Sequence, residues 1–435
     1  MSNYSDICIV GAGIGGLTCA TRLISAAVAK HLRIRVFDLN ATAGGRIQSR
    51  KIDGDEIAEL GAARYSPQLH PLFQQLMQGS GLSHAVYPFT QAVFGERVQE
   101  KLKATLLGLS SMLKEHPEDS FLDFVSHYLG PAEATRIIMA TGYDALLLPI
   151  VSASMAYDII KKHPETQNFT ENAGNQWLYA TGGYAQLLAQ LQSHAQAGGV
   201  EFQMERRLLS VEKSGDDHML AFSHKGDTQM HRTRHLLMAI PPSAMARLNL
   251  DFPASWSPYQ YDSLPLFKGF LTFDTAWWQE LGLTDKVLMA DNPLRKIYFK
   301  SDKYLLFYTD SESASYWRDS LEQGEEVYLE RVRNCLQQAL PLNGLPLPDI
   351  KGHFYKHWPQ GVEFCLEPEA EHPAALLHPD GIIACSDAYT AHCGWMEGGL
   401  ISARQATSLL LERLSAEAAI PGSNQALSIA PTARA

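Results

Sequence analysis

Residues 6–38 read DICIVGAGIGGLTCATRLISAAVAKHLRIRVFD, and this stretch decides the fold of the chain. The apolar run Ile7–Val10 is typical of a buried parallel strand. A glycine-rich turn follows at once, then a helical stretch from Leu17 to about Ala29 and a second strand, Ile34–Asp38. This order predicts an α/β fold that opens with the βαβ unit of a dinucleotide-binding domain.

The turn has the spacing GxGxxG between residues 11 and 16. Its first glycine permits the tight turn, its second lets a pyrophosphate approach the backbone, and its third lets helix and strand pack closely. The following helix would face the phosphates with free N–H groups. An aspartate ends the second strand, where a carboxylate can accept hydrogen bonds from ribose hydroxyls. We therefore predict a nucleotide site at Gly11, Gly13, Ile14, Gly15, Gly16 and Asp38.

The composition is that of a globular protein and excludes some partners. The 435 residues suffice for roughly two or three domains. With 36 basic and 47 acidic residues the net charge is -11, which argues against nucleic acid because a phosphate backbone needs a basic face. No apolar run approaches the ~18 residues of a membrane span, and the first residues lack the pattern of a secretory signal. Six scattered cysteines without a CxxC pair indicate reduced thiols, so we expect a cytoplasmic protein without membrane contact.

The rest of the chain alternates between strand-like and helix-like stretches. Short alternating strands between residues 264 and 310 favour an antiparallel sheet, and helices are expected at 322–340 and 397–414. The expected parts are a discontinuous nucleotide-binding domain (1–70, 195–250 and 378–415), a largely helical region (71–194), a substrate-binding domain (251–377) and a disordered tail (416–435).

Further glycine-containing segments accompany the first turn in a fixed order. They read GGR at 44–46, ELGA at 59–62, SD at 386–387 and GWMEGG at 394–399. Together they resemble the signatures of the flavin amine oxidase family. The resemblance implies a Rossmann-like FAD-binding domain with a sheet-plus-helix substrate domain, and noncovalently bound FAD. The cofactor contacts that it implies are Gly45, Arg46, Gly61, Ala62, Ala63, Arg64, Asp387, Trp395 and Met396.

Longer stretches, among them ELGAARYSPQLHP, GYDALLLP, NPLRKIYFK and ACSDAYTAHCGWMEGGLISAR, resemble one branch of that family, the L-tryptophan oxidases of violacein biosynthesis. This resemblance implies oxidation of L-tryptophan to indole-3-pyruvate imine, with O2 reduced to H2O2 and the imine passed to the next pathway enzyme. We also expect a homodimer. Three alternatives stay open: an oxidase of another aromatic L-amino acid or of an amine, a flavin desaturase, and a flavin-bearing redox or assembly partner without enzyme activity.

Arg64 directly follows the ELGA segment, so it should project from the flavin edge into the active site. A guanidinium can hold a carboxylate bidentately, which suits an α-amino acid as substrate. The alternative is a surface arginine in an ordinary ion pair.

Lys268 is the only charged residue between Leu264 and Phe273. Burying an ammonium costs several kcal/mol unless it has a partner or loses its proton, so a lysine there indicates a functional site. The resemblance implies that it reaches the flavin N5 through a water and assists proton movement. The alternative is an edge lysine that faces solvent.

Tyr308 and Trp395 are candidates for the substrate side. By strand alternation Tyr308 shares a face with Leu306 and Asp310, and its phenol could bind the substrate carboxylate opposite Arg64. The resemblance places Trp395 in the wall of the substrate cavity. A packing role in the core is the alternative for both aromatic residues.

His163 precedes Pro164 and is therefore expected to end a helical stretch. Proton transfer or indole binding is its possible function, and helix capping is the alternative. Tyr143 is a further candidate for substrate binding. His392 and Cys393 lack further ligands at metal spacing, so we expect no metal site.

Overall fold

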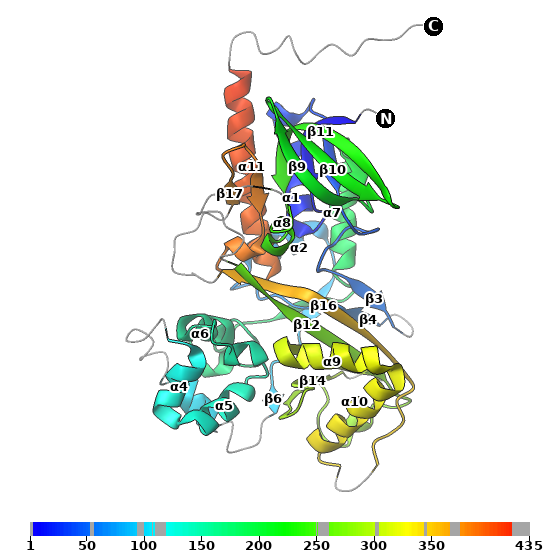
Figure 1. Cartoon of the computed structure of the whole chain (residues 1–435). Helices are drawn as coiled ribbons and strands as arrows, with labels where there is room; N and C mark the ends of the chain where they lie inside the picture. Colours follow the sequence, from blue (N-terminus) through cyan, green and yellow to red (C-terminus); the bar gives the residue numbers. More distant parts are fainter. Residues whose placement is uncertain are drawn as a thin grey trace.

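The computed structural model describes residues 3–52, 56–93, 100–106, 108, 119–248, 250, 261–300, 304–342, 346–365 and 375–419. Figure 1 shows an elongated molecule of two halves. The upper half contains the strands next to the N-terminus and the long helix that leads to the C-terminus. The lower half contains α4–α6 on one side and α9 and α10 on the other.

The upper half is built on an eight-stranded sheet whose main path has the order β17-β18-β11-β1-β2-β8. β1 pairs in parallel with β2 and β11, and β10 and β9 extend β11 as an antiparallel hairpin. The strands are β1 (Tyr4–Val10), β2 (Ile34–Phe37), β8 (Glu201–Gln203), β9 (Arg207–Ser214), β10 (Asp217–His224), β11 (Asp227–Met238), β17 (Ala375–Leu377) and β18 (Ile383–Cys385).

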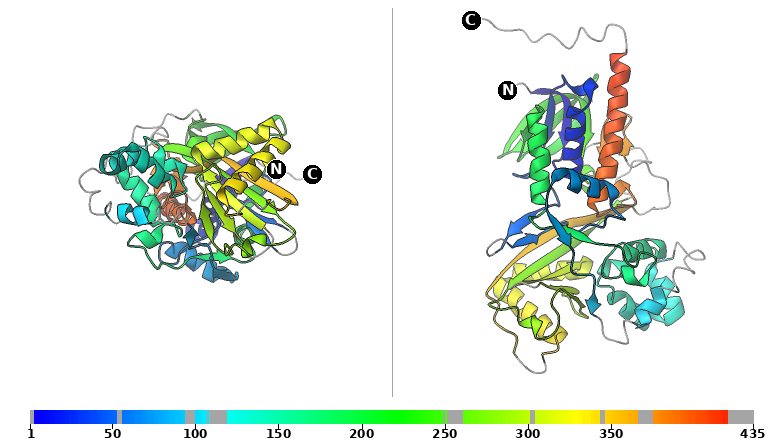
Figure 2. Two further views of the ribbon diagram at one scale, coloured as in Figure 1. Left: turned by 90° about the horizontal axis from the view of Figure 1, so that it is seen from below. Right: turned by 180° about the vertical axis from the view of Figure 1, so that it is seen from behind.

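Both faces of this sheet are buried, which explains the continuous apolar run in β1. Ile7 and Ile9 pack into a cluster with α1 (Ile14–Ile24) and α11 (Met396–Ala418), and α7 (Ala185–Ala197) lies beside α1. The alternate residues of β1 pack on the other face against β9 and β10. Figure 2 shows from behind the three helices together on one side of the sheet.

The lower half contains a six-stranded sheet of order β16-β12-β15-β14-β13-β6, antiparallel except for the β13–β6 pair. Two helices, α9 (Ser311–Gln323) and α10 (Glu325–Ala339), cover its apolar face around Phe307 and Trp317. The strands are β6 (Ala92–Val93), β12 (Tyr261–Thr272), β13 (Val287–Met289), β14 (Lys296–Phe299), β15 (Tyr304–Asp310) and β16 (Gly352–Cys365).

A helical region with its own apolar cluster flanks this second sheet. It comprises α4 (Phe121–Leu129), α5 (Pro131–Met139), α6 (Ala153–Lys161) and the short helices η2 (Asp144–Leu147) and η3 (Gln167–Phe169). The remaining elements are η1 (Ala27–Ala29), β3 (Ser49–Lys51), β4 (Ile57–Glu59), α2 (Pro71–Ser80), β5 (His84–Val86), β7 (Leu178–Ala180), α8 (Pro242–Met245), η6 (Trp277–Gln279) and η7 (Asp387–Tyr389).

The mixed α/β fold agrees with the sequence prediction, but several boundaries differ. The first helix ends at Ile24 and only a 3-10 turn continues to Ala29. β16 and α9 were not predicted, and the expected disordered tail is wrong for residues 416–418, which are the last residues of α11. Residues 420–435 and parts of the expected helical and substrate-binding regions, such as 109–118 and 251–260, lie outside the described residues. Within the described part of the chain, no helix is both long and apolar enough to span a bilayer.

Candidate active site

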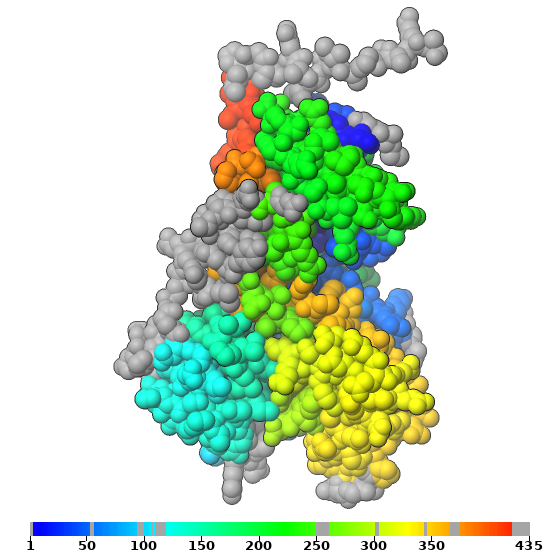
Figure 3. All heavy atoms as spheres, in the orientation of Figure 1, coloured from blue at the N-terminus to red at the C-terminus, as the bar shows by residue number. Residues whose placement is uncertain are grey.

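A large cavity of about 1070 Å³ lies where the two sheets meet. Its walls come from the glycine turn after β1, the loops after β2 and β4, strands β12 and β16, helix α6 and the segment before α11. Figure 3 shows the helical region, in teal, and the α9–α10 region, in yellow, side by side below the upper half. The cavity joins the glycine turn to side chains of the second sheet, because both contribute lining residues.

The three glycines of the GxGxxG spacing lie in different surroundings. Gly11 has a φ of 106°, and a Cβ added to it would lie 2.2 Å from the carbonyl oxygen of Ala239. A Cβ on Gly16 would lie 1.8 Å from the carbonyl oxygen of Gly11, so Gly16 serves packing and does not line the cavity. Gly13 lines the cavity, and a Cβ there would meet no atom of the described residues within 4 Å. The backbone at Gly13 is thus open to a diphosphate.

Asp38 ties the end of β2 to the glycine turn. Its Oδ2 accepts the backbone N–H of Ala12 at 2.7 Å, and its Oδ1 accepts the backbone N–H of Asn40 at 2.8 Å. Each carboxylate oxygen can accept about two hydrogen bonds, and Asp38 lines the cavity. Oδ2 therefore keeps the capacity to accept a ribose hydroxyl.

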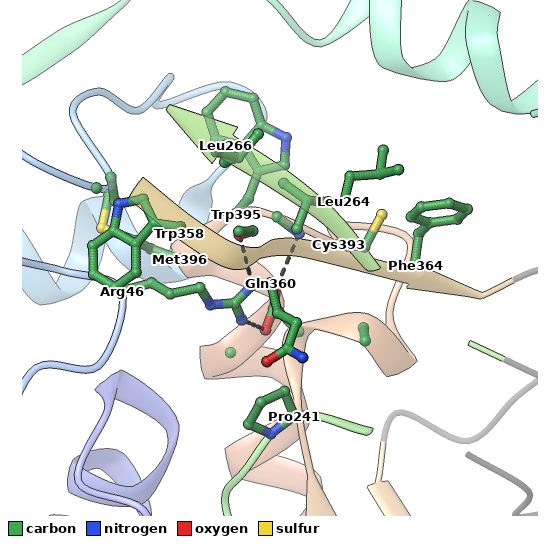
Figure 4. A pocket seen from close by; sticks show the side chains of 18 of the residues that line it. Arg46, Pro241, Leu264, Leu266, Trp358, Gln360, Phe364, Cys393, Trp395 and Met396 are labelled. Atoms are coloured by element: carbon green, nitrogen blue, oxygen red, sulfur yellow. Dashed lines mark hydrogen bonds and ion pairs between the residues drawn. The ribbon is translucent and has the colours of Figure 1, made fainter. Parts of the chain in front are cut away.

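Arg46 connects two signatures that lie far apart in the sequence. Its guanidinium forms an ion pair with Asp387 and donates to the carbonyl of Gly361 at 3.2 Å. Asp387 in turn accepts the backbone N–H of Gly394 at 2.9 Å. Figure 4 shows Arg46 in the pocket below Trp395, with dashed lines marking these contacts. Arg46 thereby holds the loop before α11 in place while lining the cavity.

The N-terminus of α11 begins directly at the cavity. Trp395 precedes the helix, and Met396 and Gly399 of its first turn line the cavity, so the positive end of the helix dipole faces that space. Glu397 points elsewhere. Its carboxylate accepts the backbone N–H groups of Leu72 at 3.0 Å and Phe73 at 2.8 Å and so caps α2.

Lys268 is buried and lines the cavity, so the alternative of a solvent-facing edge lysine is wrong. Its Nζ donates to the carbonyl oxygens of Glu59 at 3.0 Å and Gly61 at 2.6 Å. Burial lowers the pKa of Lys268 to about 7, and the charge of Arg64 adds to this while the carboxylate of Glu59 opposes it. The amine can therefore hold or release a proton near neutral pH.

Arg64 also lines the cavity but is only partly buried, and it has an internal partner that the sequence did not indicate. Its Nη2 lies 3.3 Å from Glu165, whose carboxylate also accepts the hydroxyl of Tyr298 at 2.5 Å. Burial opposes ionisation of Glu165, yet Arg64 foremost among its neighbours lowers its pKa to about 2. The Nε–H of Arg64 has no partner among the described residues. The pair is thus charged, and one guanidinium donor makes no hydrogen bond within the described residues.

The four aromatic candidates all line the cavity. Tyr143 lies 4.8 Å from His163 and 6.2 Å from Tyr308 between ring centroids, and Trp395 lies 5.3 Å from His163. The alternation predicted for β15 is confirmed, because Phe307 packs against α9 on the opposite face. Burial lowers the pKa of His163 to about 3, with Arg64 adding to the effect, so its imidazole is neutral at physiological pH. Its Nδ1 lies 2.6 Å from the carbonyl of Ile159.

Sequence reasoning missed three buried polar residues of the same wall, namely Lys296, Tyr298 and Asp310. It also missed Glu165, which does not line the cavity but is buried in contact with Arg64 and Tyr298. Lys296 is fully buried in β14, and its Nζ lies 3.1 Å from the ring centroid of Tyr143. Asp310 accepts the backbone N–H of Ala145 through Oδ1, while its Oδ2 has no partner among the described residues. Lys296 has the sequence feature that made Lys268 a candidate, a charged residue in a buried strand. Glu165 has no such feature.

Cys365, Cys385 and Cys393 also line the cavity. Burial foremost, with Asp387, raises the pKa of Cys393 to about 11, so this thiol is protonated and a poor nucleophile at neutral pH. Among the described residues, no group of three His, Cys, Asp or Glu side chains is arranged to hold a metal ion.

These residues fit an FAD molecule along the cavity. The open backbone at Gly13 would accept the diphosphate and Asp38 the ribose, while the first turn of α11 would offer its N–H groups to the flavin. Each predicted cofactor residue except Gly16 lines the cavity. The individual contacts stay predictions.

Comparison with known proteins shows the family and the fold of this chain. Residues 14–411 match the family model described as flavin containing amine oxidoreductase. An L-amino-acid oxidase from Siganus canaliculatus is 22% identical over 351 residues, which is 70% of this chain and 63% of that protein. The match therefore spans less than two thirds of that relative.

Solved structures show the same fold. Wild-type putrescine oxidase bound to putrescine superposes with a TM-score of 0.71 at 17% identity, covering 94% of this chain and 99% of that one. Cyclohexylamine oxidase from Brevibacterium oxydans also gives a TM-score of 0.71, at 16% identity and with the same coverage. At such identity the likeness establishes the fold alone.

Proposed function

The chain belongs to the family of flavin-containing amine oxidoreductases, and from that premise we propose that it oxidises an aromatic L-amino acid, with L-tryptophan as substrate. FAD is its cofactor. The proposed products are indole-3-pyruvate imine and H2O2, the latter formed from O2. Our proposal extends to the first step of violacein biosynthesis and to a next enzyme that receives the imine, for which the sequence resemblance is the support.

One observation supports an amino acid above all: a partly buried arginine in the wall of the cavity whose Nε–H makes no hydrogen bond within the described residues. Arg64 carries an Nε–H without a partner among the described residues. Glu165 and Tyr87 hold the rest of the guanidinium through contacts of 3.3 and 3.5 Å. A guanidinium fixed in this way can donate to a carboxylate without losing further conformational freedom. Simple amines offer no such acceptor.

The aromatic part of the wall supports a large, flat side chain. Tyr143, His163, Tyr308 and Trp395 surround the space beside Arg64. An indole N–H needs an acceptor when it is buried. The unpartnered Oδ2 of Asp310, in the same wall, is an acceptor of that kind. Tryptophan would therefore make one more hydrogen bond with this wall than phenylalanine, in addition to contacts with the aromatic rings.

The chain's own residues would bind and orient the substrate. Arg64 and Tyr308 would hold the carboxylate, and the aromatic rings would hold the side chain. Because the substrate amine must be neutral when Cα is oxidised, the positive charge of protonated Lys268 would help by lowering the pKa of that amine. Lys268, with a pKa of about 7, could then take up or release a proton. Two-electron oxidation of the C–N bond, with O2 as the final acceptor, is the chemistry that bound FAD supplies.

An amine oxidase is the second candidate, and the Arg64–Glu165 contact favours it. Since Glu165 already balances the charge of Arg64, the guanidinium alone adds no net charge for a carboxylate. The buried lysines in the wall speak against a desaturase with a hydrophobic substrate, because burying a cation in an apolar site is costly.

A screen of twenty amino acids and of tryptamine for peroxide release tests the proposal. L-tryptophan should give the highest rate, D-tryptophan none and tryptamine a low one. If tryptamine reacts faster than L-tryptophan, the protein is an amine oxidase. Absence of peroxide with every compound would instead favour a redox or assembly role.

A further inference from the structure

Lys296 is the most unusual polar group of the cavity wall. Its side chain is fully buried, and its Nζ makes no hydrogen bond or ion pair with any described residue. A buried ammonium without a partner is costly, so such a group points to a ligand that completes its surroundings.

Lys296 belongs to a row of side chains that crosses the second sheet. Tyr308 of β15 pairs directly with Lys268 of β12 on one side and with Lys296 of β14 on the other. Directly opposite residues of antiparallel strands share a face, and adjacent strands lie about 4.8 Å apart. The row Lys268–Tyr308–Lys296 therefore faces the cavity as one surface, with Lys296 beyond the tyrosine that is expected to bind the carboxylate.

The stem of Lys296 is held in a narrow passage. A Cβ added to Gly142, which has a φ of 78°, would lie 2.5 Å from its Cγ. The amine lies 3.1 Å from the ring centroid of Tyr143 and 4.4 Å from that of Tyr308. Two aromatic faces favour the charged amine at this place. The side chain thus has little freedom to turn away from the cavity.

The charges around this amine leave room for an anion. Burial lowers the pKa of Lys296, Glu165 opposes this effect, and Arg64 adds to it. Glu165, however, is engaged with Arg64 and Tyr298. Asp310 also faces the site, but burial raises its pKa. A carboxylate placed beside Nζ would favour the ammonium form of Lys296 and supply the missing partner.

We propose that Lys296 binds the carboxylate of the amino-acid substrate and makes the site select acids over amines. The inference rests on the proposed function. Arg64 would contribute hydrogen bonds from a guanidinium whose charge Glu165 balances, whereas Lys296 would contribute the compensating charge. This division of roles explains how a cavity that already contains an arginine ion pair can hold a further carboxylate.

Binding of two unreactive probes to the FAD-loaded protein tests this proposal. Indole-3-acetate carries a carboxylate, and indole-3-acetamide has nearly the same shape without the charge. Their dissociation constants can be measured from changes in the flavin absorbance, independently of turnover. Lys296→Met should weaken indole-3-acetate by roughly 30-fold or more, the lower end of the loss when one partner of a buried charge pair is removed. Binding of indole-3-acetamide should change less than about threefold.

Lys300→Met is the matched control. Lys300 follows β14, lies over the rings of Tyr179 and Tyr304, and has Glu56 at 3.9 Å, but it is not among the described residues that line the cavity. The Lys300→Met variant should prefer indole-3-acetate over indole-3-acetamide as strongly as the parent does. Lys296→Gln is measured as a second uncharged variant, and bound FAD and melting temperature are recorded for each protein. A ligand-binding lysine should leave the melting temperature unchanged or raise it when replaced by Met, whereas a structural one would lower it.

The outcomes separate the inference from the proposed function. If both Lys296 variants keep the parent's preference for the acid, Lys296 does not bind the carboxylate, although an amino-acid oxidase remains possible through Arg64. If the parent itself binds both probes equally, carboxylate recognition fails and both proposals are overturned. If the preference for indole-3-acetate is lost in Lys296→Met and Lys296→Gln but kept in Lys300→Met, the result supports carboxylate binding by Lys296.

Discussion

Replacing the buried Lys268 by methionine should change how the stability of this protein depends on pH. Methionine keeps much of the stem volume and removes the charge. The lysine is buried, and burial, with the help of Arg64, lowers its pKa from 10.5 to about 7. In the unfolded chain the same amine has its ordinary pKa and stays protonated to higher pH.

The sign follows from proton counting. Between about pH 7 and 10.5 the folded protein binds fewer protons at Lys268 than the unfolded chain does. The free energy of unfolding of the parent therefore rises with pH in this window and loses that increment as pH falls toward 7. One group contributes at most about 1.4 kcal/mol per pH unit, so the parent should gain roughly 2 kcal/mol over Lys268→Met between pH 7 and 9. Below about pH 6 the difference should be constant.

A second effect of the substitution does not depend on pH. The carbonyl oxygens of Glu59 and Gly61 lose the donor that lies 3.0 and 2.6 Å away. Two acceptors left without a partner cost about 1–3 kcal/mol each. This cost lowers the free energy of unfolding of the variant by the same amount at every pH, whereas the titration of Lys268 changes how that free energy depends on pH. The two effects can therefore be separated.

Urea unfolding at pH 6, 7, 8 and 9, with FAD in fixed excess, measures the difference. Lys356→Met is a suitable control because Lys356 lies directly opposite Lys268 in β16 but is only half-buried. Its curve should run parallel to that of the parent. If the curves of parent and Lys268→Met are also parallel from pH 6 to 9, the reasoning about this buried amine is wrong.

Three further predictions concern the cofactor and the substrate. Arg64→Ala should lose about 2–5 kcal/mol of transition-state stabilisation with L-tryptophan. Arg64→Lys should also lose most of its activity, because an ammonium cannot reproduce the paired donors of a guanidinium. Measurements of kcat/KM check both variants, with the amount of bound FAD as control. Gly13→Val should fold but bind FAD weakly, because its side chain would enter the open space beside the backbone, and FAD titration measures this. Gly16→Ala should not fold, because its Cβ would lie 1.8 Å from the carbonyl oxygen of Gly11, and circular dichroism measures this. Acid precipitation should release all flavin into the supernatant, because the FAD signatures contain no recognisable covalent anchor; yellow precipitate would contradict noncovalent binding.

The sequence predicted the parts of the site whose residues carry local patterns. The glycine turn and Asp38 stand at fixed spacing, and Lys268 was visible as a lone charge in an apolar strand. Lys296 escaped notice because β14 is short and begins directly after Arg295. Glu165 reaches Arg64 only through the fold, since 101 residues separate them. Ion pairs of that kind leave no trace in local sequence.

The missed elements have physical reasons as well. α9 contains the buried serines Ser313 and Ser320, so its inner face looks polar in the sequence. β16 contains Pro359 and two glycines, which ordinarily argue against a strand. It nevertheless runs along β12 as an edge strand with a register shift opposite Leu264–Leu266. An edge strand tolerates a proline that a central strand would not.

The order of strands in the upper sheet has a consequence for synthesis of the protein. β1 and β2 leave the ribosome before β11 and α11, but the cluster around Ile9 also needs Leu237 of β11 and Ala403 of α11. At ~5–20 residues per second, roughly 20–80 s pass between translation of β1 and of α11. During that interval the nascent βαβ unit has an unpaired edge and an uncovered apolar face. Chaperone demand should therefore fall on residues 4–37, the part that carries the glycine turn, until α11 is synthesised.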